Sequence, residues 1–147
     1  MRAVVQRVSE ASVTVDGEVV SKIGKGLLVL LGVAPEDDSS KIDWMVRKIV
    51  QMRIFEDEND HMNLSVEDIG GSVIVVSQFT LFADCRKGNR PSFIGAAPPE
   101  MAEKLYDELV AKMRERLGTD RVGTGCFRTH MDVRLLNDGP VTILVEC

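Results

Sequence analysis

Two short runs of aliphatic residues constrain the fold most strongly, because neither run leaves a polar face. Residues 27–31 are all Leu or Val, and residues 73–76 are all Val or Ile. Both runs are too short for a helix to be expected, and glycines precede each of them. A strand that is apolar on both sides is normally covered on both sides. We therefore predict two buried strands, with the first one in the centre of a sheet.

The remaining strand signals flank this pair. Residues 4–8 and 12–15 are rich in β-branched side chains, and Asp16-Gly17 supplies the dipeptide of a tight hairpin turn before residues 18–20. The chain should therefore open with antiparallel β-structure. Near the other end, residues 127–135 alternate strictly between apolar and polar side chains, which predicts a strand with one buried face. A turn at 137–140 should then lead into a last strand at 141–146.

Two segments have helical periodicity. Residues 40–53 carry apolar side chains at three- and four-residue spacing, with Ser39 or Ser40 as the expected cap. Pro98-Pro99-Glu100 should open a second helix that ends at Gly118, and its expected buried stripe is Met101, Leu105, Leu109 and Met113. The order of elements predicts an α+β fold in a single domain over residues 1–147, with a mainly antiparallel sheet and two main helices.

Composition limits the classes of function. The 147 residues include 44% hydrophobic and 28% charged side chains, which is typical of a soluble globular domain. No apolar run approaches the roughly 18 residues that a membrane-spanning helix needs, so we expect a cytoplasmic protein with no membrane partner. The net charge of -5 argues against coating of nucleic acid by the whole surface, although a local basic patch can still bind RNA phosphates.

Metal and cofactor chemistry has little support. The two histidines, His61 and His130, form neither an HxH nor an HExxH pattern, so no metal and no cofactor is expected. Cys85, Cys126 and Cys147 are an odd number of cysteines without CxxC spacing. This favours reduced thiols over a disulfide framework or a structural zinc site.

Two nucleophile hypotheses can be drawn from the sequence. His130 is the strand-borne base that Cys85 or Cys126 would need, although packing or surface roles suit these cysteines better. Ser77 or Ser92 could form a triad with His130 and Asp132, but neither serine lies in a Gly-x-Ser-x-Gly elbow. Both hypotheses remain open as minor alternatives.

Polar groups that follow a buried strand give a stronger signal. Ser77, Gln78, Phe79 and Thr80 place two hydroxyls, an amide and main-chain N–H groups at the rim of the predicted sheet. Such rims often carry binding or catalytic sites, although Ser and Thr also satisfy local backbone groups there.

Two other segments suit contacts with a ligand. Arg86, Lys87 and Arg90 lie within five positions that include a glycine, a pattern that suits phosphate binding as well as a solvated loop. Gly139-Pro140 forms an X-Pro bond, the kind of bond where cis peptides occur, and a turn there leaves its carbonyls open to a ligand.

Taken together, these motifs resemble those of one family. The chain reads MRAVVQRV at its start, SQFTL at 77–81, KGNRPSF at 87–93, AAPPE at 96–100 and NDGPVT at 137–142. In order and spacing this sequence resembles the D-aminoacyl-tRNA deacylases from the first strand to the last. The SQFTL and GPVT motifs are specific when they occur together.

The resemblance implies an editing hydrolase with a barrel-like sheet. Such an enzyme cleaves the ester of D-aminoacyl-tRNA, and of mischarged glycyl-tRNA, and rejects L-aminoacyl-tRNA. The resemblance also implies a homodimer in which Gly139 and Pro140, joined by a cis bond, enter the partner's pocket and exclude the side chain of an L-amino acid. A non-catalytic module that binds a nucleotide or a tRNA acceptor end is the alternative; no DNA partner is expected.

The resemblance also assigns roles to individual residues. It implies that the Phe79 main-chain N–H lies against the scissile carbonyl and that the side chains of Ser77, Gln78 and Thr80 order the pocket, with the ribose 2'-hydroxyl of the tRNA as a candidate assistant in the attack. A covalent Ser77 or Thr80 intermediate is the lesser alternative. Further pocket-lining and tRNA-binding residues that it implies are Ala96, Phe127, Met131, Arg86, Lys87 and Arg90.

The chain departs from the family at one place. Where the family commonly reads Phe-Gly-Ala-x-Met, this sequence reads Phe127-Arg128-Thr129-His130-Met131. Arg128 and Thr129 are bulkier than Gly and Ala, and Arg128 also adds a positive charge. They should alter the pocket rim or the tRNA contact rather than the deacylation itself.

Overall fold

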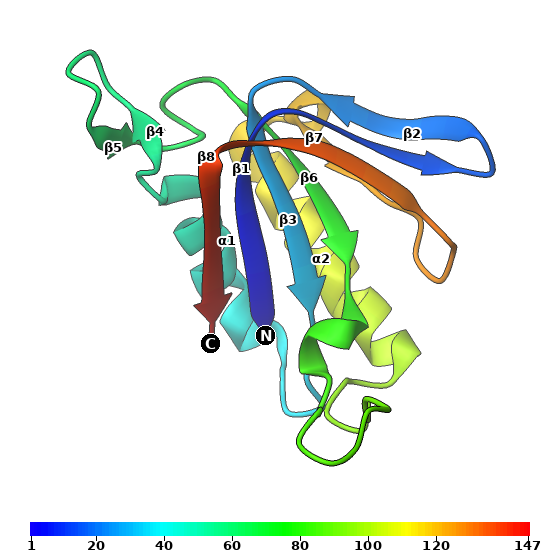
Figure 1. The fold of residues 1–147 in the computed structure, drawn as a ribbon. Coiled ribbons are helices and arrows are strands. Elements are labelled where there is room, and N and C mark those ends of the chain that lie inside the picture. The colour runs from blue at the N-terminus through cyan, green and yellow to red at the C-terminus, as the bar shows by residue number, and fades with distance from the viewer.

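Two helices cover one face of a strongly curved sheet in the computed structural model, which describes residues 1–147 (Figure 1). The helices are α1 (Ile42–Gln51) and α2 (Pro99–Leu117), with 3-10 helices at Ser39–Lys41, Phe79–Phe82 and Thr119–Arg121. The strands are β1 (Arg2–Val15), β2 (Glu18–Ile23), β3 (Gly26–Gly32), β4 (Phe55–Glu56), β5 (Met62–Leu64), β6 (Ser72–Ser77), β7 (Val122–Thr124) and β8 (Asp132–Glu146). The predicted α+β class with two main helices is confirmed.

The main sheet is mixed, with antiparallel pairs around β1 and parallel pairs beyond β3. Its order is β2-β1-β3-β6-β7, and β8 also pairs with β1. β1 is antiparallel to β2, β3 and β8, whereas β6 is parallel to both β3 and β7. The Ser21 hydroxyl on β2 accepts a hydrogen bond from the Thr124 N–H on β7 at 3.0 Å. This link between the distant strands brings the sheet close to closure, so the predicted barrel-like core is also confirmed.

The two aliphatic runs form the centre of this sheet, as predicted. Leu27 and Val29 of β3 belong to the larger core, which packs beneath the helices, whereas Leu28 belongs to a second, smaller core. Ile74 and Val76 of β6 contribute to the same second core. Both faces of the central strands are therefore covered.

The helices match their predicted positions closely, apart from one cap. α2 begins at Pro99 and ends before Gly118, which has a φ of +100°. Neither serine caps α1, whose N-cap is Lys41; Asp38 caps the preceding 3-10 helix, and its carboxylate accepts a hydrogen bond from the Ser40 N–H at 2.9 Å. The Ser39 hydroxyl instead donates to Glu108 of α2.

Two strand predictions at the C-terminal end are wrong. The alternating segment 127–135 becomes a strand only from Asp132, and residues 137–140 do not separate two strands. Instead β8 runs for 15 residues along β1, which is itself one strand where two were predicted. In the register with β1, Val8 pairs with Asn137 and Gln6 pairs with Thr142. Residues 138–141 therefore bulge out opposite Arg7.

The sequence reading also missed three short strands. These are β7 and the strands β4 and β5, which pair as a small hairpin. No helix is both long enough and apolar enough to cross a membrane.

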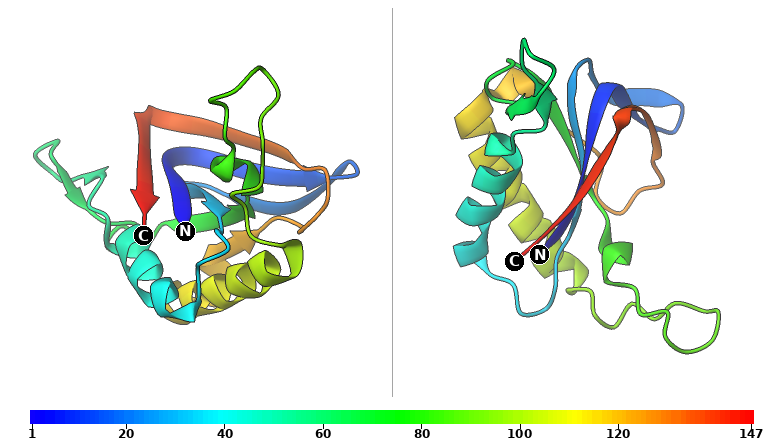
Figure 2. Two further views of the ribbon diagram at one scale, coloured as in Figure 1. Left: turned by 90° about the horizontal axis from the view of Figure 1, so that it is seen from below. Right: turned by 60° about the vertical axis from the view of Figure 1, so that its left-hand side comes forward.

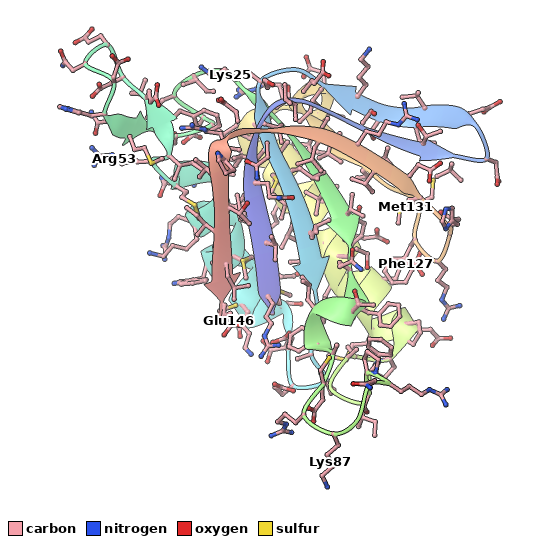
Figure 3. The ribbon with its side chains drawn as sticks, viewed as in Figure 1. Lys25, Arg53, Lys87, Phe127, Met131 and Glu146 are labelled. Atoms are coloured by element: carbon pink, nitrogen blue, oxygen red, sulfur yellow. The ribbon has the colours of Figure 1, made fainter.

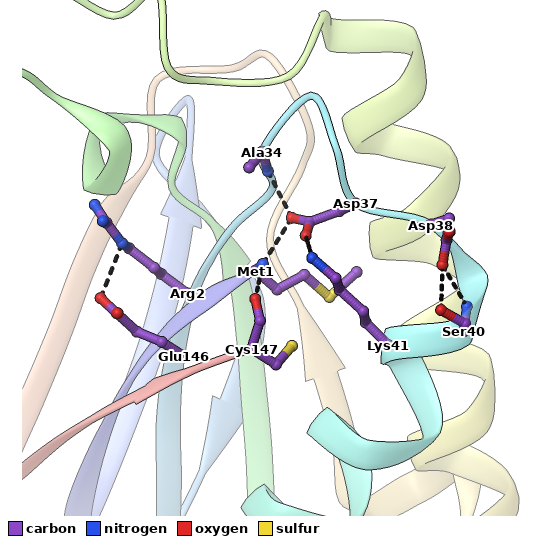
Figure 4. A network of polar contacts seen from close by, with 9 residues as sticks. All are labelled: Met1, Arg2, Ala34, Asp37, Asp38, Ser40, Lys41, Glu146 and Cys147. Atoms are coloured by element: carbon purple, nitrogen blue, oxygen red, sulfur yellow. Dashed lines mark hydrogen bonds and ion pairs between the residues drawn. The ribbon is translucent and has the colours of Figure 1, made fainter.

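The two ends of the chain lie side by side (Figure 2). The Met1 α-ammonium donates to the Cys147 carbonyl at 3.0 Å and lies 2.7 Å from the Asp37 carboxylate. Asp37 also accepts from the Ala34 N–H at 2.7 Å and from Lys41 at 2.6 Å (Figure 4). This network joins β1 and β8 to the segment that leads into α1.

Candidate active site

A cavity of about 650 Å³ opens where β6 ends. Its walls come from the end of β6, the start of the following 3-10 helix, the segment before α2 and the segment before β8. No carboxylate lines it. Six of the residues proposed from the sequence share this cavity: Ser77, Gln78, Phe79, Ala96, Phe127 and Met131.

The predicted polar rim at the end of β6 is held by backbone geometry. The Gln78 N–H donates to the Leu31 carbonyl at 2.8 Å, which extends the pairing of β6 with β3 by one residue. Thr80 does not line the cavity, but its hydroxyl accepts a hydrogen bond from the Gln78 side-chain amide at 2.5 Å. Phe79 and Thr80 begin the 3-10 helix, so their N–H groups have no acceptor within it. They are available to a bound ligand.

Aromatic side chains form one side of the cavity mouth. The Phe79 and Phe93 rings meet edge to face, with 5.2 Å between their centroids. The Phe79 side chain is 54% exposed, and the neighbouring Ile94 is 89% exposed. Exposed apolar side chains at a cavity mouth indicate a surface that another molecule covers.

Phe127 and Met131, from the segment before β8, also line the cavity (Figure 3). The Phe127 ring lies 6.1 Å from the ring of Tyr106, whose buried hydroxyl donates to the Val75 carbonyl at 2.6 Å. Burial raises the pKa of Tyr106 to about 12, so this hydroxyl remains a donor. Gly125 leaves room for Met131, since a Cβ there would lie 2.5 Å from the methionine sulfur.

The geometry gives no support to a serine triad or a cysteine nucleophile. His130 lines the cavity and its Nε2 lies 3.4 Å from an Asp132 carboxylate oxygen, but no hydrogen bond joins it to Ser77. Cys85, Cys126 and Cys147 are free and do not line the cavity. No group of three His, Cys, Asp or Glu side chains is arranged to hold a metal ion.

Gly139 and Pro140 lie outside the cavity of their own chain, exposed on the bulge of β8. Their peptide bond is cis. Gly139 has a φ of +133°, and a Cβ there would lie 2.9 Å from a Val141 methyl group and 3.1 Å from the Arg7 guanidinium.

Arg7 is a site residue that the sequence reading missed. Only 5% exposed, it donates to the Asp138 carbonyl at 3.0 Å and to the Ile54 carbonyl at 2.7 Å. It thereby anchors the bulge that carries Gly139. The available signal was its position: Arg7 follows Ala3 and Val5 at two-residue spacing on the buried face of β1.

The predicted tRNA-binding cations lie on a separate loop, with Lys87 at its far tip (Figure 3). Asp84 and Ser92 close this loop with two backbone hydrogen bonds. Arg86 donates to both Asp84 carboxylate oxygens, at 2.8 and 2.6 Å, and thereby lowers the pKa of Asp84 to about 2. Lys87 and Arg90 are exposed and form no ion pair.

Comparison with known proteins identifies the family. A sequence model described as D-Tyr-tRNA(Tyr) deacylase matches residues 4–146. The D-aminoacyl-tRNA deacylase of Clostridioides difficile (strain 630) is 61% identical, over 99% of this chain and 97% of its own. That of Desulfatibacillum aliphaticivorans is 60% identical, over 99% of each chain. This chain belongs to the D-aminoacyl-tRNA deacylase family.

Two solved structures share the fold of this chain. A structure described as "c-Myc DNA Unwinding Element Binding Protein" superimposes with a TM-score of 0.95 at 46% identity, covering 100% of this chain and 99% of the other. A second, of "a probable eukaryotic D-amino acid tRNA deacylase", has a TM-score of 0.84 at 19% identity, covering 98% and 97%, which shows the shared fold. The family model and the two curated relatives confirm the family that the sequence motifs predict.

Proposed function

We propose that this protein hydrolyses the ester of D-aminoacyl-tRNA and of glycyl-tRNA in the cavity at the end of β6. Family membership and the convergence of six predicted residues on one cavity support this function. The apolar walls suit an aminoacyl group and the terminal nucleoside, and Ser77 and Gln78 add polar groups to the lining. The observation that carries the proposal is that the N–H groups of Phe79, which lines this cavity, and of the adjacent Thr80 have no acceptor within the 3-10 helix.

Those N–H groups suit the stabilisation of an oxyanion. When water attacks an ester, negative charge develops on the carbonyl oxygen, and fixed main-chain donors stabilise it. The hydrogen bond between the Gln78 and Thr80 side chains helps to hold the same segment in place. An aminoacyl ester is already activated, so orientation of water can replace a strong protein base. Ser77 and Thr80 then act as positioning residues, with the ribose 2'-hydroxyl as an assistant.

The proposal includes a homodimer, because Gly139 and Pro140 cannot reach the cavity of their own chain in this structure. Strand β8 pairs with β1 along one edge only, so its other edge is free. Leu136 and Leu144 on this strand are 58% and 59% exposed. A long, free, apolar edge is a template for pairing with another chain. A partner seated there would bring its own Gly139-Pro140 toward the neighbouring subunit.

In such a dimer the main-chain carbonyls of Gly139 and Pro140 would hold the substrate amino group and leave no space for an L side chain. Selectivity then rests on exclusion of the wrong substrate. Glycyl esters, which have no side chain, would be admitted. The cytoplasm, where aminoacyl-tRNA is used, is the proposed location.

The test is a deacylation assay with radiolabelled D-tyrosyl-tRNA, L-tyrosyl-tRNA and glycyl-tRNA. We expect release from the D-tyrosyl and glycyl substrates and no release from L-tyrosyl-tRNA beyond a buffer blank. Release from none of the three, with tRNA still bound, would instead support a module that binds acceptor ends without turnover. Equal release from the D and L esters would leave hydrolysis in place and refute the chirality filter.

A further inference from the structure

Arg128 is the one permanently charged residue that lines the cavity. It lies at the third position of a turn that begins at Cys126, and the Thr129 hydroxyl donates to the Cys126 carbonyl at 2.9 Å. The φ of Arg128 is +61°, in the left-handed region that most side chains avoid. An arginine therefore occupies a position that favours glycine, at the mouth of the site.

The guanidinium of Arg128 has no partner within the chain. It takes part in no ion pair or hydrogen bond, and its side chain is exposed. This distinguishes it from Arg86, which binds Asp84, and from Arg7, which is buried. The nearby His130 lies beside the carboxylate of Asp132 instead. Because no Asp or Glu lines the cavity, nothing there competes for the Arg128 charge.

The position of this cation defines what it can bind. The apolar cavity between Phe79 and Phe127 suits the aminoacyl group and the nucleoside, which leaves the next phosphodiester of the chain at the mouth. Arginine binds phosphate oxygens through a planar fork of N–H donors. We propose that Arg128 contacts a phosphate of the single-stranded acceptor end and so holds the ester in register with the cavity. This inference rests on the proposed function.

The experiment compares the wild-type protein with Arg128→Ala, Arg128→Lys and Arg47→Ala. Arg47 is exposed on α1 and does not line the cavity, so its removal is a control for the loss of one positive charge. Each protein is assayed on D-tyrosyl-tRNA over a range of salt concentrations. Two further substrates are D-aspartyl-tRNA and the D-tyrosyl ester of adenosine, which carries no phosphate.

We expect Arg128→Ala to lower kcat/KM on both tRNA substrates by about five- to ten-fold, because one charge-assisted contact is lost. The log-log plot of kcat/KM against salt concentration should become shallower in slope by about 0.7, which is the value for one phosphate of a single strand. Arg128→Lys should retain part of the kcat/KM that Arg128→Ala loses. Arg47→Ala should match the wild type, and the adenosine ester should be hydrolysed equally by all four proteins.

Three results would overturn the inference. An equal loss on the adenosine ester would mean that Arg128 acts on the cavity rather than on a phosphate. A loss confined to D-aspartyl-tRNA would assign it to the amino-acid side chain, and an unchanged salt slope would exclude the contact. If the wild-type protein hydrolyses no substrate, the proposed function fails, and binding of uncharged tRNA by fluorescence anisotropy still decides on Arg128 through the same slope.

Discussion

The Met1 α-ammonium and the Asp37 carboxylate lie 2.7 Å apart with no exposure of either side chain. Around them, Asp37 accepts from Ala34 and Lys41, and the ammonium also donates to Cys147. Burial raises the pKa of Asp37, but hydrogen bonds from Lys41, from the ammonium and from the Ala34 N–H outweigh it. The pKa of Asp37 therefore lies below its ordinary value of 3.8.

Asp37→Asn should lower the free energy of unfolding by about 3 kcal/mol at pH 7, because it leaves a buried ammonium without its counter-charge. A carboxylate with a lowered pKa stabilises the fold above its unfolded pKa, and this stability is lost as the pH falls through the folded value. The difference between the two proteins should therefore shrink below about pH 4. Urea titrations at several pH values measure it. Asp43→Asn is the control, since Asp43 forms only an exposed pair with Lys112. A constant difference down to pH 2 would contradict this account.

Arg7→Met should affect both stability and activity. The substitution leaves the buried carbonyl of Ile54 without its donor, at about 1–3 kcal/mol, and also removes the hydrogen bond to the carbonyl of the exposed Asp138. It also frees the bulge that carries Gly139, so deacylation should fall by more than the loss of folded protein explains. Chemical denaturation and deacylation rates below the unfolding transition separate the two effects. Arg53→Met removes an exposed arginine that precedes β4 and should leave the rates unchanged. Full activity in a folded Arg7→Met protein would show that the anchor is dispensable.

The parts of the site that depend on local sequence could be predicted. The parts whose structure depends on pairing between distant strands could not. The end of β6 follows directly from an apolar run that stops at Ser77. In contrast, Asn137-Asp138-Gly139-Pro140 has every local sign of a turn, yet β1 pairs with β8 on both sides of it and converts it into a bulge. Only the fold places Arg7 opposite that bulge.

The alternation at 127–135 misled the sequence reading for a different reason. All four residues line the cavity, but Phe127 and Met131 are partly buried whereas Arg128 and His130 are exposed. A period of two can thus come from the wall of a pocket as well as from a strand. The positive φ of Arg128, which interrupts any strand there, cannot be inferred from an arginine in the sequence.

Complementation between two inactive variants tests whether the site is shared across a dimer. Gly139→Ala should disable the bulge, since its Cβ would lie 2.9 Å from Val141 at a φ of +133°. Phe79→Pro removes the main-chain donor of the cavity. In a mixed dimer one site combines both defects and the other has neither, so mixing after subunit exchange should restore about a quarter of the wild-type rate. Each variant alone remains inactive, and a mixed sample without activity would place the whole site in one chain.

Ser77→Ala should keep a tenth or more of the wild-type kcat, because no base contacts the Ser77 hydroxyl and its role is to position the substrate. Loss of a true serine nucleophile lowers kcat by about 10⁶-fold. Rapid quench with labelled D-tyrosyl-tRNA gives the rate and also detects any acylated protein. Thr80→Val is the companion variant, because it removes the acceptor of the Gln78 amide. Stoichiometric labelling of the wild-type protein that disappears in Ser77→Ala would show a covalent mechanism.

The basic loop should bind tRNA mainly through its unpaired cations. Lys87 and Arg90 are free to meet phosphates, whereas Arg86 must first leave Asp84, to which it donates two hydrogen bonds. Lys87→Ala with Arg90→Ala should therefore weaken tRNA binding and reduce the salt slope by about 0.7–0.9 per lost contact. Arg86→Ala alone would also expose the Asp84 charge, so the informative variant is Asp84→Asn with Arg86→Ala, which removes the pair without changing the net charge. That pair variant should retain nearly the wild-type slope in anisotropy titrations. A slope that falls as far in the pair variant as in the Lys87 and Arg90 variant would show that Arg86 gives up Asp84 for a phosphate in the complex.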